Sequence, residues 1–236
     1  MSILTDPAYI VPPVPDASRG VAWLRASVAR FSSGDAHRRR RALAVALLAT
    51  IPPDTLADHF AAEAALAARA EGAATAEGAA LVEGAADAGG GSGAPHPVAV
   101  LARALGIEVP VEWVEEVAQG YQPGTGDQGR ADLAVERLVG RLGGVYDEAT
   151  AARIGVLVQA CQATVALIDR STNASVDDVL RDDPPAPATK RLAPNGEIVW
   201  VPLSGDLAFG AGPHACPGRA HALALVRAAT ARSHAD

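Results

Sequence analysis

Leu207-Ala208-Phe209-Gly210-Ala211-Gly212-Pro213-His214-Ala215-Cys216-Pro217-Gly218-Arg219 is a stretch near the end of the chain in which three glycines and two prolines fall within nine residues. Such a composition excludes a regular helix or strand and predicts a tight, fixed loop. Residues 219–232 are rich in strong helix formers and predict a helix directly after Gly218. Cys216 is therefore expected where unpaired N–H groups and the helix dipole lower a thiol pKa. The pattern predicts a thiolate that binds a metal.

A buried free cysteine in a glycine-rich turn is the plainer interpretation of the same loop. However, the spacing Phe-x-x-Gly-x-His-x-Cys-x-Gly over residues 209–218 resembles the heme-binding loop of cytochrome P450 enzymes. The resemblance implies heme b (iron protoporphyrin IX), with Cys216 as the iron ligand. The further cofactor-binding residues that it implies in this loop are Phe209, Gly210, His214 and Gly218.

The composition indicates one mainly helical domain over residues 1–236, because 49% of the residues are hydrophobic but only 4% are aromatic. A net charge of −7 argues against nucleic-acid binding. Two cysteines exclude a disulfide framework, and no long apolar run or leader is apparent, so we expect a cytoplasmic protein without membrane contact. Residues 1–19 are expected to form an extended arm, and residues 87–95 a flexible loop.

Apolar periodicity predicts further helices before the cysteine loop. An Asn-Gly pair at 195–196 predicts a hairpin turn ahead of a strand at 197–203. The expected fold class is mainly α: a truncated P450-like helical core with one short β-hairpin. The helices are expected at 20–31, 37–48, 54–66, 96–107, 111–122, 130–143, 148–169 and 175–181.

One histidine and four arginines follow one another in His37-Arg38-Arg39-Arg40-Arg41. A solvated basic patch, or a docking site for an acidic partner, would explain such a run. His37 and Arg41 share one helix face at i and i+4, and this spacing resembles the segment of bacterial cytochrome P450 enzymes that binds a heme propionate. Residues 176–193 resemble the family's Glu-x-x-Arg helix and the strand behind it, which implies that Arg191 also faces a propionate.

The helix expected at 148–169 is apolar nearly all round, as a buried central helix would be. It resembles the long P450 helix that crosses the oxygen-binding face of the heme, which implies a catalytic role for Thr164. Family members usually carry an acid directly before this threonine, but this chain has Ala163. Without the resemblance, Thr164 is core packing, with its hydroxyl bonded back to a helix carbonyl.

These patterns favour a heme-thiolate oxidoreductase, either a monooxygenase or a peroxygenase, that acts on a small organic substrate. A redox partner and a homodimer are the protein partners we expect. The alternative is a non-catalytic heme-binding sensor or partner subunit derived from a cytochrome P450. A helical protein that keeps the loop without binding heme is a third interpretation.

Overall fold

The protein is described by a computed structural model, which places residues 2–78 and 94–231. Within these residues the chain is mainly helical, with one antiparallel hairpin. The helices are α1 (Gly20–Ser27), α2 (Gly34–Leu48), α3 (Pro53–Gly78), α4 (Pro97–Ala104), α5 (Val111–Gly120), α6 (Gln128–Arg141), α7 (Glu148–Arg170), α8 (Val176–Asp182) and α9 (Arg219–Thr230). The strands are β1 (Ala188–Leu192) and β2 (Ile198–Pro202), and short 3-10 turns are η1 (Ala29–Phe31), η2 (Gly205–Leu207) and η3 (Gly212–His214).

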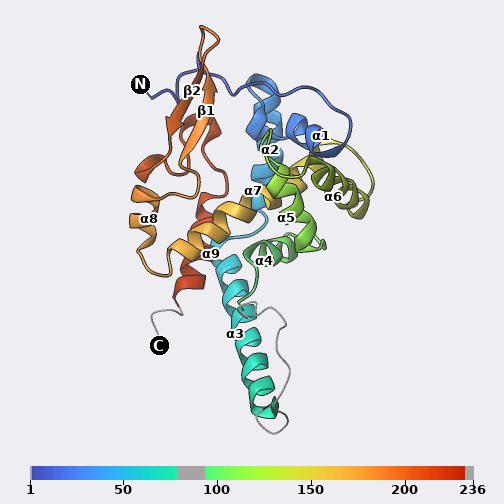
Figure 1. Ribbon diagram of the computed structural model, residues 1–236, viewed down its shortest axis with the longest axis vertical. Helices are drawn as coiled ribbons and strands as arrows, with labels where there is room; N and C mark the ends of the chain where they lie inside the picture. Colours follow the sequence, from blue (N-terminus) through green and yellow to red (C-terminus); the bar gives the residue numbers. More distant parts are fainter. Residues whose placement is uncertain (1, 79–93, 232–236) are drawn as a thin grey trace.

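Helix α7 crosses the middle of the molecule, and α1, α2, α4, α5 and α9 pack against it (Figure 1). Its side chains from Ala151 to Val158 are nearly all buried, because neighbouring helices cover most of its circumference. Helix α7 is long and apolar enough to cross a membrane by length and composition, although no membrane span is expected from the sequence. Half of the most apolar 18-residue segment of α7 is buried inside the protein, as in the central helix of a helical core.

The hairpin lies at one end of the molecule, beside the first residues of the chain (Figure 1). Asn195 and Gly196 form its turn, as predicted, and Arg191 is paired with Val199 across the two strands. The N-terminal arm runs along the outer edge of β1, where Ile10 and Leu192 exchange backbone hydrogen bonds of 3.1 and 2.8 Å. Residues 2–19 contain no helix, and the expected loop at 87–95 lies outside the described residues except for its last two.

Most helix boundaries lie within three residues of those expected, and two segments differ more. The segment 20–31 is two elements, because α1 ends at Ser27 and η1 follows it. Helix α3 extends beyond residue 66 to Gly78, because the alanine-rich repeats that follow, whose sequence also indicates a helix, have a high helix propensity. In Figure 1, the second half of α3 projects from the rest of the molecule.

A carboxylate at the start of α7 joins that helix to the basic run of α2. The Glu148 oxygens accept hydrogen bonds from Arg39 (Nε 2.7 Å, Nη2 2.8 Å) and from Arg40 (Nε 2.8 Å). The Arg39 hydrogen bonds, with a smaller contribution from Arg40, lower the pKa of Glu148 from 4.5 to about 2. Two residues of the basic run therefore have a structural role, which neither interpretation of that run anticipated.

We expect Glu148→Gln to lower the free energy of unfolding by about 1 kcal/mol at pH 7, since this partly buried ion pair is lost. The carboxyl pKa is lower in the folded chain, so its contribution is present above pH 4.5 and disappears as pH falls toward 2. Urea unfolding at several pH values measures this difference. Glu108→Gln is the control, because Glu108 is 85% exposed and lies 3.6 Å from Arg141. A difference between wild type and Glu148→Gln that does not shrink in acid would contradict the assignment.

Candidate functional site

The loop between β2 and α9 is closed by its own backbone. The Cys216 N–H donates to the Phe209 carbonyl oxygen over 2.8 Å, and the Gly210 N–H donates to the Leu207 oxygen over 2.7 Å. Gly210 has a φ of +71°, a conformation that favours glycine whatever lies beside it. Gly218 is the N-cap residue of α9. The loop thus holds Cys216 at the beginning of α9, as the sequence predicts.

The N-terminal arm supports this loop from one side. Gly212 has a φ of +64°, and a Cβ there would lie 2.9 Å from the Leu4 carbonyl oxygen. Leu4 itself is buried in a small cluster with Val201 and Leu203, against which Ala211 packs. Only glycine combines that backbone angle with so close a neighbour. The arm therefore fixes the position of the loop that carries Cys216.

The thiol of Cys216 is accessible at its surface, although protein atoms surround it closely enough to desolvate it. This desolvation raises its pKa, and a hydrogen bond from the Gly218 N–H and the charge of Arg41 oppose the rise only in part. The predicted lowering of the pKa by the helix start is therefore wrong for the chain alone. A thiolate here requires a cation at the sulfur, since burial disfavours the unpaired charge.

Two histidines from distant parts of the chain meet beside the loop. His37 on α2 and His214 in η3 stack with ring centroids 3.9 Å apart and planes inclined by 35°. Desolvation, with smaller contributions from His37, Arg191 and Arg41, lowers the pKa of His214 from 6.5 to about 4. His37 is buried, and its pKa is also lowered, first by desolvation and then by Arg41. Both rings are neutral at pH 7, so each has one N–H that can donate a hydrogen bond to a ligand without adding positive charge.

Arg191 is a buried cation next to these histidines, and its charge contributes to the lowered pKa of both rings. Its Nη1 donates to the Lys190 carbonyl oxygen (2.9 Å) and to Thr189 Oγ1 (3.2 Å). Among the described residues, no carboxylate forms an ion pair with Arg191 or with Arg41. Buried charge is costly unless it is paired, so this cluster of His37, Arg41, Arg191 and His214 (the cationic cluster) is suited to an anionic ligand.

The helical repeat of α2 divides the basic run among different surroundings. Arg38 pairs with Asp35 on the exposed side, while Arg39 and Arg40 bind Glu148. His37 and Arg41, one turn apart, remain for the cationic cluster, as their spacing predicts. An open hollow of about 330 Å³ lies between α2 and the loop. It is lined by His37, Arg38, Arg41, Ala42, Val45, Gly212 and Pro213.

Phe209 and Thr164 lie away from the cationic cluster. Phe209 packs against a small apolar group that contains Leu167 of α7, and the Arg219 guanidinium lies 5.4 Å from its ring centroid. Thr164 is buried on α7, whereas Ala163 is exposed. The hydrogen bonds found among the described residues include none from the Thr164 hydroxyl, so the bond back to a helix carbonyl is not observed.

Comparison with known proteins gives a structural match but no sequence match. No family model and no curated protein matches the sequence. The fold is similar to that of P450BioI, solved in complex with an acyl carrier protein ligated to hexadec-9Z-enoic acid, with a TM-score of 0.68. The two chains are 16% identical, and the alignment covers 97% of this chain and 80% of the other. This chain has a P450-like fold. The predicted fold class is confirmed.

Two contributions to the site were missed in the sequence. Leu4 belongs to an arm whose prolines indicate only an irregular lead-in. Arg30, in the short turn η1, adds positive charge that reinforces the lowering of the Arg191 pKa by desolvation and opposes part of the rise in the Cys216 pKa. No local pattern distinguishes either residue, because each approaches the site through a tertiary contact.

We expect Gly212→Ala to destabilise the protein more than Gly196→Ala. Both glycines have positive φ, so both substitutions carry the backbone cost of about 1–2 kcal/mol. Only the methyl group at 212 meets a neighbour, the Leu4 oxygen, and we expect about 1–3 kcal/mol of additional cost for that clash. The free energies of unfolding in urea measure both. Equal losses would show that the arm does not support the loop.

Proposed function

We propose that the chain binds heme b through Cys216 and acts as a heme-thiolate oxidoreductase on a small organic substrate. The observation that carries the proposal is the cationic cluster beside the cysteine loop. Heme b brings two propionates, and buried arginine and histidine donors without carboxylate partners are the groups that such anions require. The P450-like fold supports the proposal independently.

The residues of the site fit such a cofactor. His37, Arg41, Arg191 and His214 would hold the propionates, and Phe209, Gly210 and Gly218 would lie around the ligand loop. A heme with a thiolate ligand supplies oxygen or peroxide activation, because the thiolate donates electron density to the iron. The Cys216 thiol loses its proton on binding a metal, which removes the cost of a buried, unpaired thiolate.

The decisive experiment is the spectrum of the reduced, carbon monoxide-treated protein. We expect a red-shifted Soret band typical of a thiolate ligand, and its loss in Cys216→Ala. Cys161→Ala is the matched control, since Cys161 is the other cysteine of the chain and lies in α7. An unchanged band in Cys216→Ala, or its loss in Cys161→Ala alone, would overturn the ligand assignment.

Arg41→Ala should weaken heme retention by about 1.5–3 kcal/mol, the usual contribution of a hydrogen bond to a charged group. Arg39→Ala is the control on the same helix, because the Arg39 guanidinium binds Glu148. Transfer of heme to an excess of apomyoglobin measures retention, and urea unfolding corrects for the stability that Arg39 provides. Equal losses of retention from the two substitutions would favour a diffuse electrostatic effect.

The absence of an acid beside Thr164 favours either a peroxide-dependent reaction or the alternative of a non-catalytic heme-binding sensor or partner subunit. Oxygen activation requires two protons, and neither Ala163 nor Gln162 can supply one at neutral pH. Ala163 is exposed on α7, so a carboxylate at this position would be solvated. Peroxide already carries both electrons and both protons.

Any turnover should therefore be faster with hydrogen peroxide than with oxygen and a reductase. We expect Ala163→Asp to increase the product formed per reducing equivalent in the oxygen-dependent reaction. Ala160→Asp, one turn earlier on α7, controls for added charge. If the wild type already converts nearly every reducing equivalent into product with oxygen, protons are supplied by another route and the absence of an acid at position 163 does not limit the reaction. A protein that binds heme but turns over with neither oxidant would support the non-catalytic alternative.

The proposed function also includes a protein partner. We propose a redox partner or a second copy of the chain, supported by exposed apolar side chains such as Leu66 on α3 and Trp200 on β2. The acyl carrier protein in the neighbour's complex makes a carrier-bound acyl chain the first substrate to try.

A further inference from the structure

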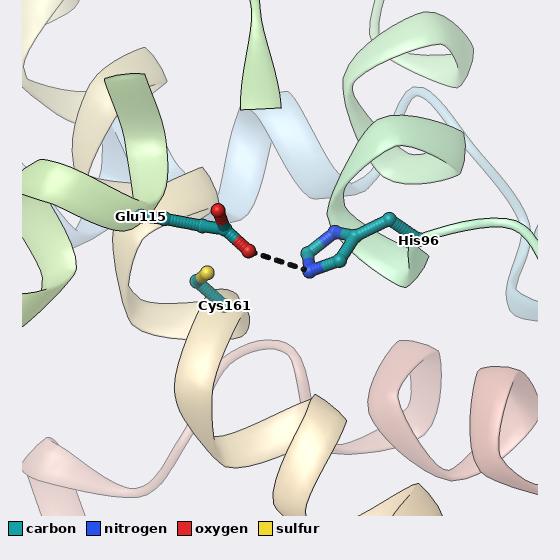
Figure 2. Close-up of side chains that lie close together, drawn as sticks. All are labelled: His96, Glu115 and Cys161. Carbon is teal, nitrogen blue, oxygen red and sulfur yellow. Dashed lines mark ion pairs between the residues drawn. The ribbon is translucent and has the colours of Figure 1, made fainter. Parts of the chain in front are cut away.

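Three side chains of metal-binding type, from three separate segments of the chain, lie close together away from the cysteine loop. They are His96, which precedes α4, Glu115 of α5 and Cys161 of α7. Figure 2 shows them pointing toward one another. His96 Nε2 lies 3.4 Å from Glu115 Oε1, and the three potential ligand atoms all lie within 4.8 Å of one another.

We propose that His96, Glu115 and Cys161 bind one zinc ion, with a fourth position open to water. Imidazole nitrogen, carboxylate oxygen and thiolate sulfur are all ligands of zinc, and three protein ligands with an open position are an established arrangement. Ligand atoms around a tetrahedral zinc ion are about 3.3–3.6 Å apart, given bond lengths of about 2.0–2.3 Å. The histidine and glutamate already have this separation, and the sulfur approaches it by moving roughly 1 Å.

The charges of the site balance a divalent cation. Glu115 contributes one negative charge, and Cys161 contributes the second when its S–H proton leaves to solvent. Burial, with a smaller contribution from Glu115, raises the pKa of the Cys161 thiol to about 11, so the metal-free site holds a neutral thiol at pH 7. Burial also lowers the pKa of His96, against the opposing charges of Glu115 and Glu112. The imidazole is therefore neutral, which is the form that binds a metal.

The metal-free histidine has a second role that zinc must displace. His96 Nδ1 accepts a hydrogen bond from the Val98 N–H over 3.2 Å, and so caps α4. The ring proton is therefore on Nε2, directed at Glu115. Zinc at Nε2 moves this proton to Nδ1 and removes the cap, at a cost of roughly fivefold in affinity. That cost is small beside the affinity that a thiolate and an imidazole provide together.

The position of the site gives it a structural consequence. The side chains of His96 and Glu115 are 28% and 45% exposed, so an ion can reach them, while Cys161 anchors the site in the core. Zinc would join α4 and α5 to the central helix α7, three residues before Thr164. This inference is independent of the proposed heme function, because it uses none of the same residues.

The test uses the full-length chain with Cys216→Ser, which leaves Cys161 as the only thiol. Cobalt(II) is the probe, since it substitutes for zinc and a bound thiolate gives a charge-transfer band in the near ultraviolet. We expect one cobalt ion per chain, displacement by zinc, and release of one proton per ion. Below the thiol pKa, affinity should rise about tenfold per pH unit. A thiolate band that persists after the further change Cys161→Ser, or no band at all, would overturn the proposal.

Surface variants keep the test valid if the buried substitution impairs folding. Glu115→Gln should lower zinc affinity at least about tenfold, since it removes a charged ligand. Glu116→Gln is the matched control, because the next residue along α5 binds Arg130 instead. Circular dichroism establishes that each variant is folded. Equal affinities for the two variants would overturn the proposal, as would an unchanged Val98 amide resonance on zinc binding.

Discussion

Positive charge that is buried without a counter-ion of its own is the constraint on which the rest of this structure depends. The buried charge is that of Arg191 on the hairpin. Arg41 of α2 and the neutral His214 of the cysteine loop lie near it, so three separate parts of the fold must be held in place to bring them together. Because the histidines are neutral, they add little electrostatic repulsion to the two arginines. The Lys190 carbonyl oxygen and Thr189 Oγ1 accept hydrogen bonds from the Arg191 guanidinium. Such an arrangement costs free energy in the chain alone, and a bound dianion would offset that cost and stabilise this region.

The features predicted from the sequence are those with a local cause. The apolar pattern of α7, the Asn-Gly turn and the glycine-rich loop each depend on neighbouring residues, and the structure places all three as expected. The Arg39–Glu148 contact and the support of Gly212 by Leu4 join residues far apart in the chain, and no local pattern encodes them. The Cys216 pKa was predicted in the wrong direction for the same reason, since the helix start is local whereas desolvation depends on everything packed around the thiol.

Similarity of fold and identity of chemistry are separate questions here. At 16% identity, the relationship to P450BioI concerns the path of the backbone, while the chemistry rests on particular side chains. Under the proposed function Ala163 would be such a side chain, because proton delivery needs a titratable group that neither the backbone nor an alanine supplies. The His96, Glu115 and Cys161 group makes the complementary point. Their side chains could bind a metal ion, and similarity to a protein of the same fold gives no indication of such a group.

The contact between the N-terminal arm and the cysteine loop has a consequence for biosynthesis. Residues near the start of the chain contact β1 and the loop before α9, which are synthesised much later than the arm. During translation the arm therefore has no partner until these later segments have been made. Contacts of such long sequence separation slow folding, so an N-terminal arm that looks irregular in sequence contributes to the slow steps by which this fold forms.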